Sequence, residues 1–269
     1  MRFTYLGTAA AEGFPALFCN CKFCNEARRL GGKNVRTRSQ SIINDDLLID
    51  FPADAYMHFL KNGIEGDKIK YILVTHAHSD HFYPNDFFMR HTYYAHDMRA
   101  PVLKMLCSES VFKRLGDVPQ NVEVCVMKPF DTVELDGYRV TALPARHMLD
   151  SVALFYIIEG EKTVLYAHDT GYFYDEVFEY IKERGIVFDF VSLDCTNVDI
   201  PISDNDGHMG FPNIGRVIDR LTSIGAITEK TKRFVNHFSH NGNPLHHLLL
   251  ERAREYGCDV SYDGCCVEI

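Results

Sequence analysis

The chain has 269 residues, of which 46% are hydrophobic and 24% charged, a composition typical of an ordinary globular protein with a sizeable core. Its 28 Lys and Arg against 37 Asp and Glu give a formal net charge of −9, and no long basic run appears. Extended binding of nucleic acid is therefore not expected, because it rests on clustered Lys and Arg. A small anionic substrate is still allowed, since bound metals supply local positive charge.

Short strands and amphipathic helices alternate along the chain, as the hydrophobic periodicity indicates. Strands are predicted for RFTYLG, SIIN, LLIDF, YILVT, VEVCVMK, YRVTALP, SVALFYIIE, KTVLYA, FDFVSLD and the short RFVN. Helices are predicted for DAYMHFLKNG, which Gly63 closes, and for FYDEVFEYIKERG, NIGRVIDRLTSIG and NPLHHLLLERAREYG. No linker, repeat or low-complexity tract divides the chain, so we expect one α/β domain over residues 1–269.

The N-terminal MRFTYLGTAAAEGF lacks the charged-then-apolar pattern of a signal peptide, and no apolar run approaches the length of a membrane span. We therefore expect a cytoplasmic protein without membrane contact. The chain has nine Cys, and in a reducing compartment closely spaced Cys bind metal more often than they form disulfides.

The first metal-binding pattern is FCNCKFCNEARR, which holds Cys19, Cys21 and Cys24 within six residues. Three thiolates this close favour a tetrahedral zinc site with one ligand still to be found. A helix opening near Cys21 would place Cys24 in its first turn, where the helix dipole favours a thiolate. Three reduced structural thiols are the alternative.

The second pattern is THAHSDHF, directly after the buried strand YILVT. His76 and His78 lie two residues apart, so an extended chain points both the same way, and a turn must then bring in Asp80 and His81. Imidazole and carboxylate suit Zn, Fe or Mn. Four such groups are too many for one open catalytic site and too few for two, so further ligands are expected elsewhere in the chain.

The next segment, Phe82 to Pro101, is both aromatic and polar and is the least regular part of the chain. Its place suits a loop or lid over a site. A surface excursion that packs its own aromatic side chains is an equal alternative.

H-x-H-x-D-H after a strand resembles the signature of the metallo-β-lactamase superfamily. The resemblance implies a four-layer αββα sandwich with a metal site at one edge. It also implies three later ligands, for which LPARH offers His147, HDTG offers Asp169 and NHFSH offers His237. The implied assignment puts His76, His78 and His147 on one metal, Asp80, His81 and His237 on the other, and Asp169 between the two. His168 is given a supporting or simple structural role.

The Cys loop is similar to that of the PhnP-type phosphodiesterases, in which a His three residues after the last catalytic His is the fourth zinc ligand. This implies that His240 closes the site of Cys19, Cys21 and Cys24. PqqB-type proteins have a similar loop. In PhnP-type proteins a His at the place of His208 contacts phosphate and assists the leaving group, although a His packed in a Gly-flanked loop is the alternative here. Asp80 and His208 are thus the candidate catalytic residues.

The resemblance implies a phosphodiesterase with two divalent transition metals, Zn, Mn or Fe, and one structural zinc. Two metals about 3.5–4 Å apart can share a hydroxide that attacks a small phosphodiester, linear or cyclic. Hydrolysis of a thioester or lactam at the same site is one alternative, and a non-hydrolytic PqqB-like protein is another. The stretch FYPNDFFMRHTYY replaces the Gly-containing stretch usual in PhnP-type proteins, which leaves the substrate open. A homodimer is compatible with these expectations.

Overall fold

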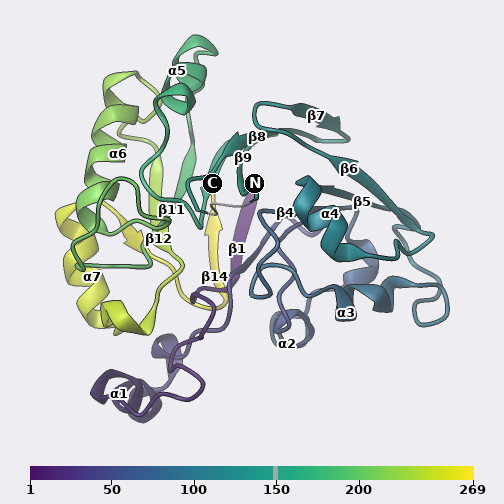
Figure 1. The fold of residues 1–269 in the computed structure, drawn as a ribbon, viewed down its shortest axis with the longest axis horizontal. Coiled ribbons are helices and arrows are strands. Elements are labelled where there is room, and N and C mark those ends of the chain that lie inside the picture. Colours follow the sequence, from purple (N-terminus) through teal and green to yellow (C-terminus); the bar gives the residue numbers. More distant parts are fainter. Residues whose placement is uncertain (148–150) are drawn as a thin grey trace.

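The computed structural model describes residues 1–147 and 151–269, and in this part of the chain two seven-stranded sheets stack between two layers of helices (Figure 1). The first sheet has the order β14 (Cys265–Glu268), β1 (Arg2–Gly7), β2 (Gln40–Ile43), β3 (Leu47–Ile49), β4 (Tyr71–Val74), β5 (Leu103–Cys107) and β6 (Val122–Val126). The second has the order β13 (Asp259–Val260), β12 (Lys232–Asn236), β11 (Phe190–Asp194), β10 (Thr163–Ala167), β9 (Leu154–Glu159), β8 (Tyr138–Pro144) and β7 (Thr132–Leu135). The four-layer αββα sandwich expected from the sequence is confirmed.

The direction of the strands decides where the functional loops meet. Strands β3 to β6 are parallel to one another, and so are β10 to β13, with Val164 of β10 opposite Phe190 of β11. Strand β8 is antiparallel to β9, which is antiparallel to β10, so β8 runs in the same direction as β10. The carboxyl ends of these strands therefore gather at one edge of their sheet.

Helices cover the outer face of each sheet (Figure 1). The first sheet carries α2 (Ala55–Asn62), α3 (Pro84–Phe87) and α4 (Glu109–Leu115), and the second carries α5 (Asp175–Glu183), α6 (Phe211–Ser223) and α7 (His246–Glu255). Short 3₁₀ turns occur at η1 (Gly32–Asn34), η2 (Gly66–Lys68), η3 (Phe88–Arg90) and η4 (His240–Gly242). Helix α1 (Lys22–Leu30) stands apart from the sandwich at the lower left of Figure 1. No helix of the described residues is long and apolar enough to cross a membrane.

Three apolar layers hold the sandwich together. Between the sheets, Phe3 and Tyr5 of β1 pack with Tyr166 and Phe190, and the ring centroids of Phe3 and Phe190 are 4.8 Å apart. Outside the second sheet, α6 buries one face through Phe211, Ile214, Val217, Ile218 and Leu221, which recur at the three- and four-residue spacing of an amphipathic helix. A third layer lies between the first sheet and α3 and α4.

The predicted elements have observed counterparts, with shifts at some ends. Strands β1 and β8 have the bounds that the sequence predicts, and Gly63 closes α2 in a left-handed conformation at φ 64°. Helix α7 begins later than predicted, because Asn243 takes a left-handed conformation that ends η4. Strands β5, β7, β13 and β14 and helix α4 were missed; β7 and β13 are short and partly exposed.

The Phe82–Pro101 segment forms α3 and η3 and folds over the outer face of the first sheet. Its aromatic rings pack together, with Phe88 beside His91 and Tyr93 at 5.0 Å from Tyr94 between ring centroids. The segment therefore packs its own aromatic side chains, as the surface excursion does, and it lies on the outer face of the first sheet.

Candidate metal centre

The predicted ligands of the THAHSDHF motif and the three later ligands come together at the carboxyl edge of the sheets. His76, His78, Asp80 and His81 follow β4, His147 follows β8, Asp169 follows β10, and His237 follows β12. Their ligand atoms form two groups, each within 4.8 Å: His76, His78, His147 and Asp169, and then Asp80, His81, Asp169 and His237. Asp169 belongs to both groups, as a bridging residue must.

In the first group three imidazole nitrogens face one point. His78 Nδ1 lies 2.9 Å from His76 Nε2 and 3.2 Å from His147 Nε2. Asp169 Oδ2 completes the group at 3.3 Å from His76 Nε2 and 3.5 Å from His147 Nε2. His78 is exposed while His76 is fully buried, so the group opens to solvent on the His78 side.

In the second group the same carboxylate meets two further imidazoles. His81 Nε2 lies 3.0 Å from Asp169 Oδ2, 3.4 Å from Asp80 Oδ2 and 3.2 Å from His237 Nε2. His237 Nε2 is 2.7 Å from Asp169 Oδ1. All four residues are buried.

These spacings fit atoms that share a cation. Metal–nitrogen and metal–oxygen bonds of about 2.0–2.1 Å place neighbouring ligand atoms about 3.0 Å apart in an octahedron and about 3.4 Å apart in a tetrahedron. Asp169 Oδ1 is buried and makes no hydrogen bond to the described residues, although His237 Nε2 is close. A buried carboxylate oxygen needs a partner, and nitrogen and oxygen donors suit divalent Zn, Mn or Fe.

The shifted pKa values favour the ligating forms of His76, His147 and Asp169, whereas His81 holds a proton that a metal would displace. Burial lowers the pKa of both His76 and His147, so their imidazoles are neutral and free to bind a metal. Burial raises the pKa of Asp169, but the nearby imidazoles of His237 and His81 have a larger effect in the opposite direction. They hold the pKa of Asp169 well below its usual value. Burial likewise lowers the pKa of His81, yet the carboxylates of Asp169, Asp50 and Asp80 hold it well above its usual value. Three carboxylates around one buried imidazole mark a place where negative charge gathers.

Hydrogen bonds behind the ligands fix which nitrogen faces the centre. Asp50, at the end of β3, accepts from His81 Nδ1 at 2.7 Å and from the backbone and hydroxyl of Thr75 at 2.8 and 2.9 Å. His147 Nδ1 donates to the Gly207 carbonyl at 3.0 Å. With Nδ1 protonated in this way, Nε2 of His81 and of His147 is left as the ligand atom.

Asp194, at the end of β11, supports the other side of the centre. It accepts from the backbone N–H groups of Asp169, Thr196 and Met209 at 3.0 Å each. His208 Nδ1 lies 2.9 Å from Asp194 Oδ2, and the Thr196 hydroxyl lies 2.8 Å from His237 Nδ1. Asp194 thus orients the backbone of one predicted ligand and the ring of a candidate catalytic residue.

A further group, Asp169, Asp194, His208 and His237, also has its ligand atoms within 4.8 Å. Both oxygens of Asp194 already accept hydrogen bonds from the residues above, and Nδ1 of both imidazoles is turned to that network. The group is therefore a hydrogen-bonded support rather than a third metal site.

Three residues around the centre have left-handed backbone conformations, which residues other than glycine rarely adopt. Asp50, Asp169 and His237 have φ values of 64°, 50° and 63°. Asp50 and His237 are the first residues after β3 and β12, and Asp169 is the second residue after β10. The turn in the backbone redirects each side chain toward the centre. Strain of this kind persists only where the surroundings enforce it, and it is concentrated at functional sites.

His168 lies beside Asp169 but faces the core. Its Nε2 is 2.6 Å from the Ser192 hydroxyl, and Asn236 Nδ2 is 3.2 Å from its Nδ1. It is fully buried, and burial lowers its pKa well below the usual value. His168 therefore joins β10, β11 and β12 inside the sandwich, which agrees with the structural role.

The predicted structural zinc site is also brought together. The ligand atoms of Cys19, Cys21, Cys24 and His240 lie within 4.8 Å, and Cys24 Sγ is 3.7 Å from His240 Nδ1, close to a ligand edge of tetrahedral zinc. The N–H of Cys24 lowers the pKa of Cys21, the N-cap of α1, to about 6, whereas burial raises that of Cys24 to about 11. The thiolate expected from the helix N-terminus is thus favoured at Cys21 rather than at Cys24.

The two metal sites share one stretch of chain, from His237 to His240. Glu12 Oε1 accepts from the Ser239 hydroxyl at 2.6 Å and from the His240 N–H at 3.1 Å. Arg36 is buried behind this stretch, with its guanidinium 4.5 Å from the centroid of the Phe238 ring. The position of His237 is therefore tied to that of the Cys loop.

Sequence reasoning missed Asp50, Asp194 and Thr196. LLIDF carries Asp50 as its next-to-last residue and FVSLD ends in Asp194, a strand-end position like that of Asp169 in KTVLYAHD. A search for carboxylates at the carboxyl ends of all predicted strands finds Asp50 and Asp194. Thr196 carries no such signal.

A sequence family described as the beta-lactamase superfamily domain matches residues 48–229. Among solved structures, a diphosphatase from the PhnP family is 22% identical with a TM-score of 0.74, over 100% of this chain and 97% of that one. Zn²⁺-bound PqqB from Methylobacterium extorquens is 17% identical with a TM-score of 0.74, over 100% of both chains. The short form of human tRNase Z is 13% identical with a TM-score of 0.67, over 100% and 99%. No curated protein matches. At these identities the likeness is one of fold.

Proposed function

Because this chain belongs to the metallo-β-lactamase superfamily, we propose that it hydrolyses a small phosphodiester, linear or cyclic, at a centre of two divalent metals. Membership of the superfamily supports a metal-dependent hydrolase. The observation that carries the proposal is the pair of ligand groups joined by Asp169, because two metals close together suit the displacement of a phosphoryl group.

The residues assigned to the two metals are those of the two groups, with His76, His78 and His147 on one side, Asp80, His81 and His237 on the other, and Asp169 shared. When bound, two divalent metals supply positive charge beside the phosphoryl oxygens and lower the pKa of water from about 15.7 towards 7. Asp50 and Asp194 hold the ligands in orientation, so that little reorganisation is needed during the reaction.

His208 is placed to donate a proton to the leaving oxygen. Its Nδ1 is engaged by Asp194, which leaves Nε2 for the substrate, and 28% of its side chain is exposed. Its ring centroid lies 4.7 Å from that of His147, one of the residues assigned to the first metal. An alkoxide leaving group needs such a donor at neutral pH.

The carboxylate ligands support a substrate other than a lactam, and the names of similar structures support a phosphate ester over a thioester. The Asp80 and Asp169 carboxylates are hard ligands, in contrast with the Cys ligand of true β-lactamases. Two of the similar structures are named as a diphosphatase and a tRNase, and the bonds that such enzymes cleave are phosphate esters or anhydrides. The chain has a net charge of −9, which does not suit extended nucleic acid. We therefore propose that the substrate is a small molecule in the cytoplasm.

The first experiment combines metal analysis with assays under Mn and Zn. Purified protein should hold three metals per chain, one of them resistant to chelation. Bis(4-nitrophenyl) phosphate, a thioester and a chromogenic lactam are then assayed side by side, and only the phosphate diester should be hydrolysed well. A fully metal-loaded protein inert on all three substrates would contradict the proposal and favour a PqqB-like role.

The second experiment replaces His208 with Ala. Metal content should be unchanged, because His208 lies outside the two ligand groups, while turnover of a diester with an alkyl leaving group should fall about 10²- to 10⁴-fold. A diester with a 4-nitrophenolate leaving group needs no proton and is the matched control. Equal turnover of the alkyl diester by variant and wild type would remove the proton-donor role.

A further inference from the structure

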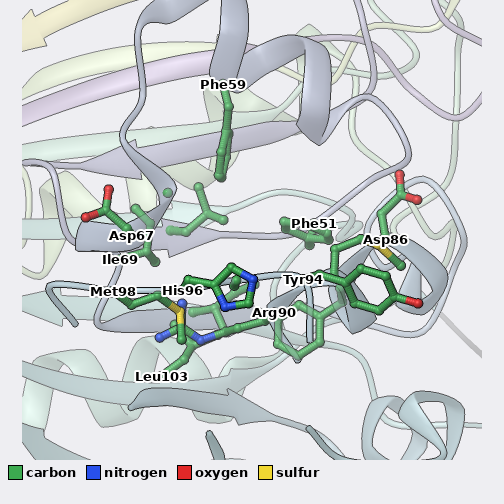
Figure 2. Close-up of a pocket in the computed structure, with 16 residues that line it drawn as sticks. Phe51, Phe59, Asp67, Ile69, Asp86, Arg90, Tyr94, His96, Met98 and Leu103 are labelled. Atoms are coloured by element: carbon green, nitrogen blue, oxygen red, sulfur yellow. The ribbon is translucent and has the colours of Figure 1, made fainter. Parts of the chain in front are cut away.

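A cavity lies on the outer face of the first sheet and is lined by none of the residues of the metal centre. It measures about 430 Å³ and lies between the outer face of the sheet, α2 and the Phe82–Pro101 segment (Figure 2). Leu48 and Ile72 come from the sheet, Phe59 from α2, and Phe87 and Leu103 from the segment and the strand that follows it. The volume is in the range of pockets that hold small organic ligands.

None of the predicted metal ligands lines this cavity, but two neighbouring residues of the chain connect the cavity with the metal centre. Asp50 faces His81, whereas the next residue, Phe51, lines the cavity. The Phe51 N–H donates to the His81 carbonyl at 2.7 Å, and Phe51 pairs with Phe82 across a β-bridge. One strand end thus presents a carboxylate to the centre and an aromatic ring to the cavity.

Arg90 is the exceptional residue of the cavity wall. Its Nη2 donates to the Ala100 carbonyl at 2.6 Å, while its Nε is buried and has no hydrogen-bond partner in the described part of the chain. No carboxylate of residues 1–147 and 151–269 lies within ion-pair distance of it. Asp67, which also lines the cavity, is bound instead by Arg99, with 2.8 Å between Nη2 and Oδ1.

The position of Arg90 shows where an anion could pair with its charge, which no carboxylate of the described residues does. Figure 2 shows it along the wall formed with Met98 and Leu103, away from Asp86 at the opposite end. Asn121 Nδ2 donates to its carbonyl at 2.8 Å and anchors the backbone. A half-buried cation without a counter-ion is costly, and burial lowers its pKa; an anion brought into the cavity would offset that cost.

We propose that this cavity binds a small aromatic carboxylate or sulfonate, whose charged group pairs with Arg90 while its rings lie among Phe51, Phe59 and Phe87. The guanidinium supplies a two-pronged donor that matches a carboxylate. The aromatic walls favour a flat apolar body, since offset and edge-on ring contacts add to the burial of apolar surface. The site is distinct from the metal centre and takes a ligand of a different class.

Calorimetric titration of the metal-loaded full chain with 2-naphthoate, in saturating inorganic phosphate to occupy the metal centre, tests the proposal. Naphthalene-2-methanol is the uncharged probe of the same size. Arg90→Met should weaken naphthoate binding about ten- to a hundredfold and leave the alcohol unchanged, because a hydrogen-bonded charge pair is lost. Arg114→Met removes the same charge from an exposed residue of α4 that does not line the cavity, and it should leave both affinities unchanged.

A second variant separates this cavity from any other site. Ala95 lines the cavity from the excursion and is only half-buried, so Ala95→Trp should fill the space without disturbing the sheet and abolish binding of both probes. Naphthoate binding that survives either Arg90→Met or Ala95→Trp at wild-type affinity would overturn the proposal. So would the absence of naphthoate binding by the wild-type protein.

Discussion

Replacing Asp50 with Asn tests whether the network behind the ligands sets the metal affinity. Asp50 is fully buried and accepts three hydrogen bonds, one from His81 Nδ1 and two from Thr75. The single carbonyl oxygen of Asn can keep the two bonds from Thr75, and its amide group then meets the protonated Nδ1 of His81, donor against donor. The imidazole must turn or move its proton to Nε2, the atom that faces Asp80, Asp169 and His237.

The size of the effect follows from the number of ligands disturbed. Only His81 is misoriented, so one of the four ligands in the second group is lost or weakened while His76, His78 and His147 are untouched. Loss of an outer hydrogen bond of this kind lowers metal affinity by about 10- to 100-fold, or about 1.4–2.8 kcal/mol. We therefore expect one of two sequential binding steps to shift by that amount and the other to stay within about twofold.

Competition titration of the metal-free catalytic centre with a chromophoric chelator, with Zn and then Mn, measures both steps. Asp45→Asn is the matched control, because Asp45 is a largely exposed partner of Arg2 in the turn before β3. Circular dichroism should show the same fold for both variants. If Asp50→Asn binds both metals as tightly as wild type, Asp50 does not orient His81; if both steps weaken equally, the two ligand groups are not separate sites.

Cys21→Ser should reduce the metal content from three to two per chain and lower the free energy of unfolding by about 4 kcal/mol, the contribution of a ligand present at a thousand times its Kd, with activity falling in parallel. The exposed Cys266→Ser is its control, and unchanged activity with one zinc fewer would leave the Cys site without influence on the centre. Dialysis against EDTA should remove the two catalytic metals and abolish activity, while the thiolate-bound zinc and most of the thermal stability persist; restoration of activity by Mn or Zn is the readout, and loss of all three metals at once would contradict the assignment. Burial lowers the pKa of His58 to about 4, so the native protein resists a proton that the unfolded chain accepts below about pH 6.5. Stability is complete above that pH and should fall by up to about 1.4 kcal/mol per unit between pH 6.5 and 4, a slope that chemical denaturation should find reduced in His58→Gln. An identical slope in that variant would show that His58 does not carry the effect.

How far the sequence predicts the site depends on how local each signal is. Four predicted ligands lie in one motif after one strand. The resemblance of that motif to the superfamily implied three later ligands, and His147, Asp169 and His237 fit because each follows a strand in the implied order. Asp50 and Asp194 also lie at the ends of strands. Their importance lies in the groups that donate hydrogen bonds to them, and these donors come close only when the two sheets pack together. Order along the chain carries no such information.

The ends of helices and the shapes of surfaces are likewise set by contacts in the folded chain, which local sequence patterns do not reveal. The start of α7 depends on the left-handed Asn243, which nothing in the local hydrophobic period indicates. The cavity exists because the Phe82–Pro101 segment, α2 and three strands of the first sheet meet in space, and only this arrangement leaves Arg90 without a nearby carboxylate among the described residues. The aromatic content of the excursion was visible in the sequence, but the surface it would cover was not.

The left-handed conformations at Asp50, Asp169 and His237 have an evolutionary consequence. Each costs about 1–3 kcal/mol in a residue with a β-carbon, a cost that glycine avoids. While catalysis is under selection these positions must keep their side chains. In a descendant that has lost its metals, glycine at the same three positions would stabilise the fold and should accumulate early. The identity of these residues in related chains is therefore a simple test of whether a given related protein is still an enzyme.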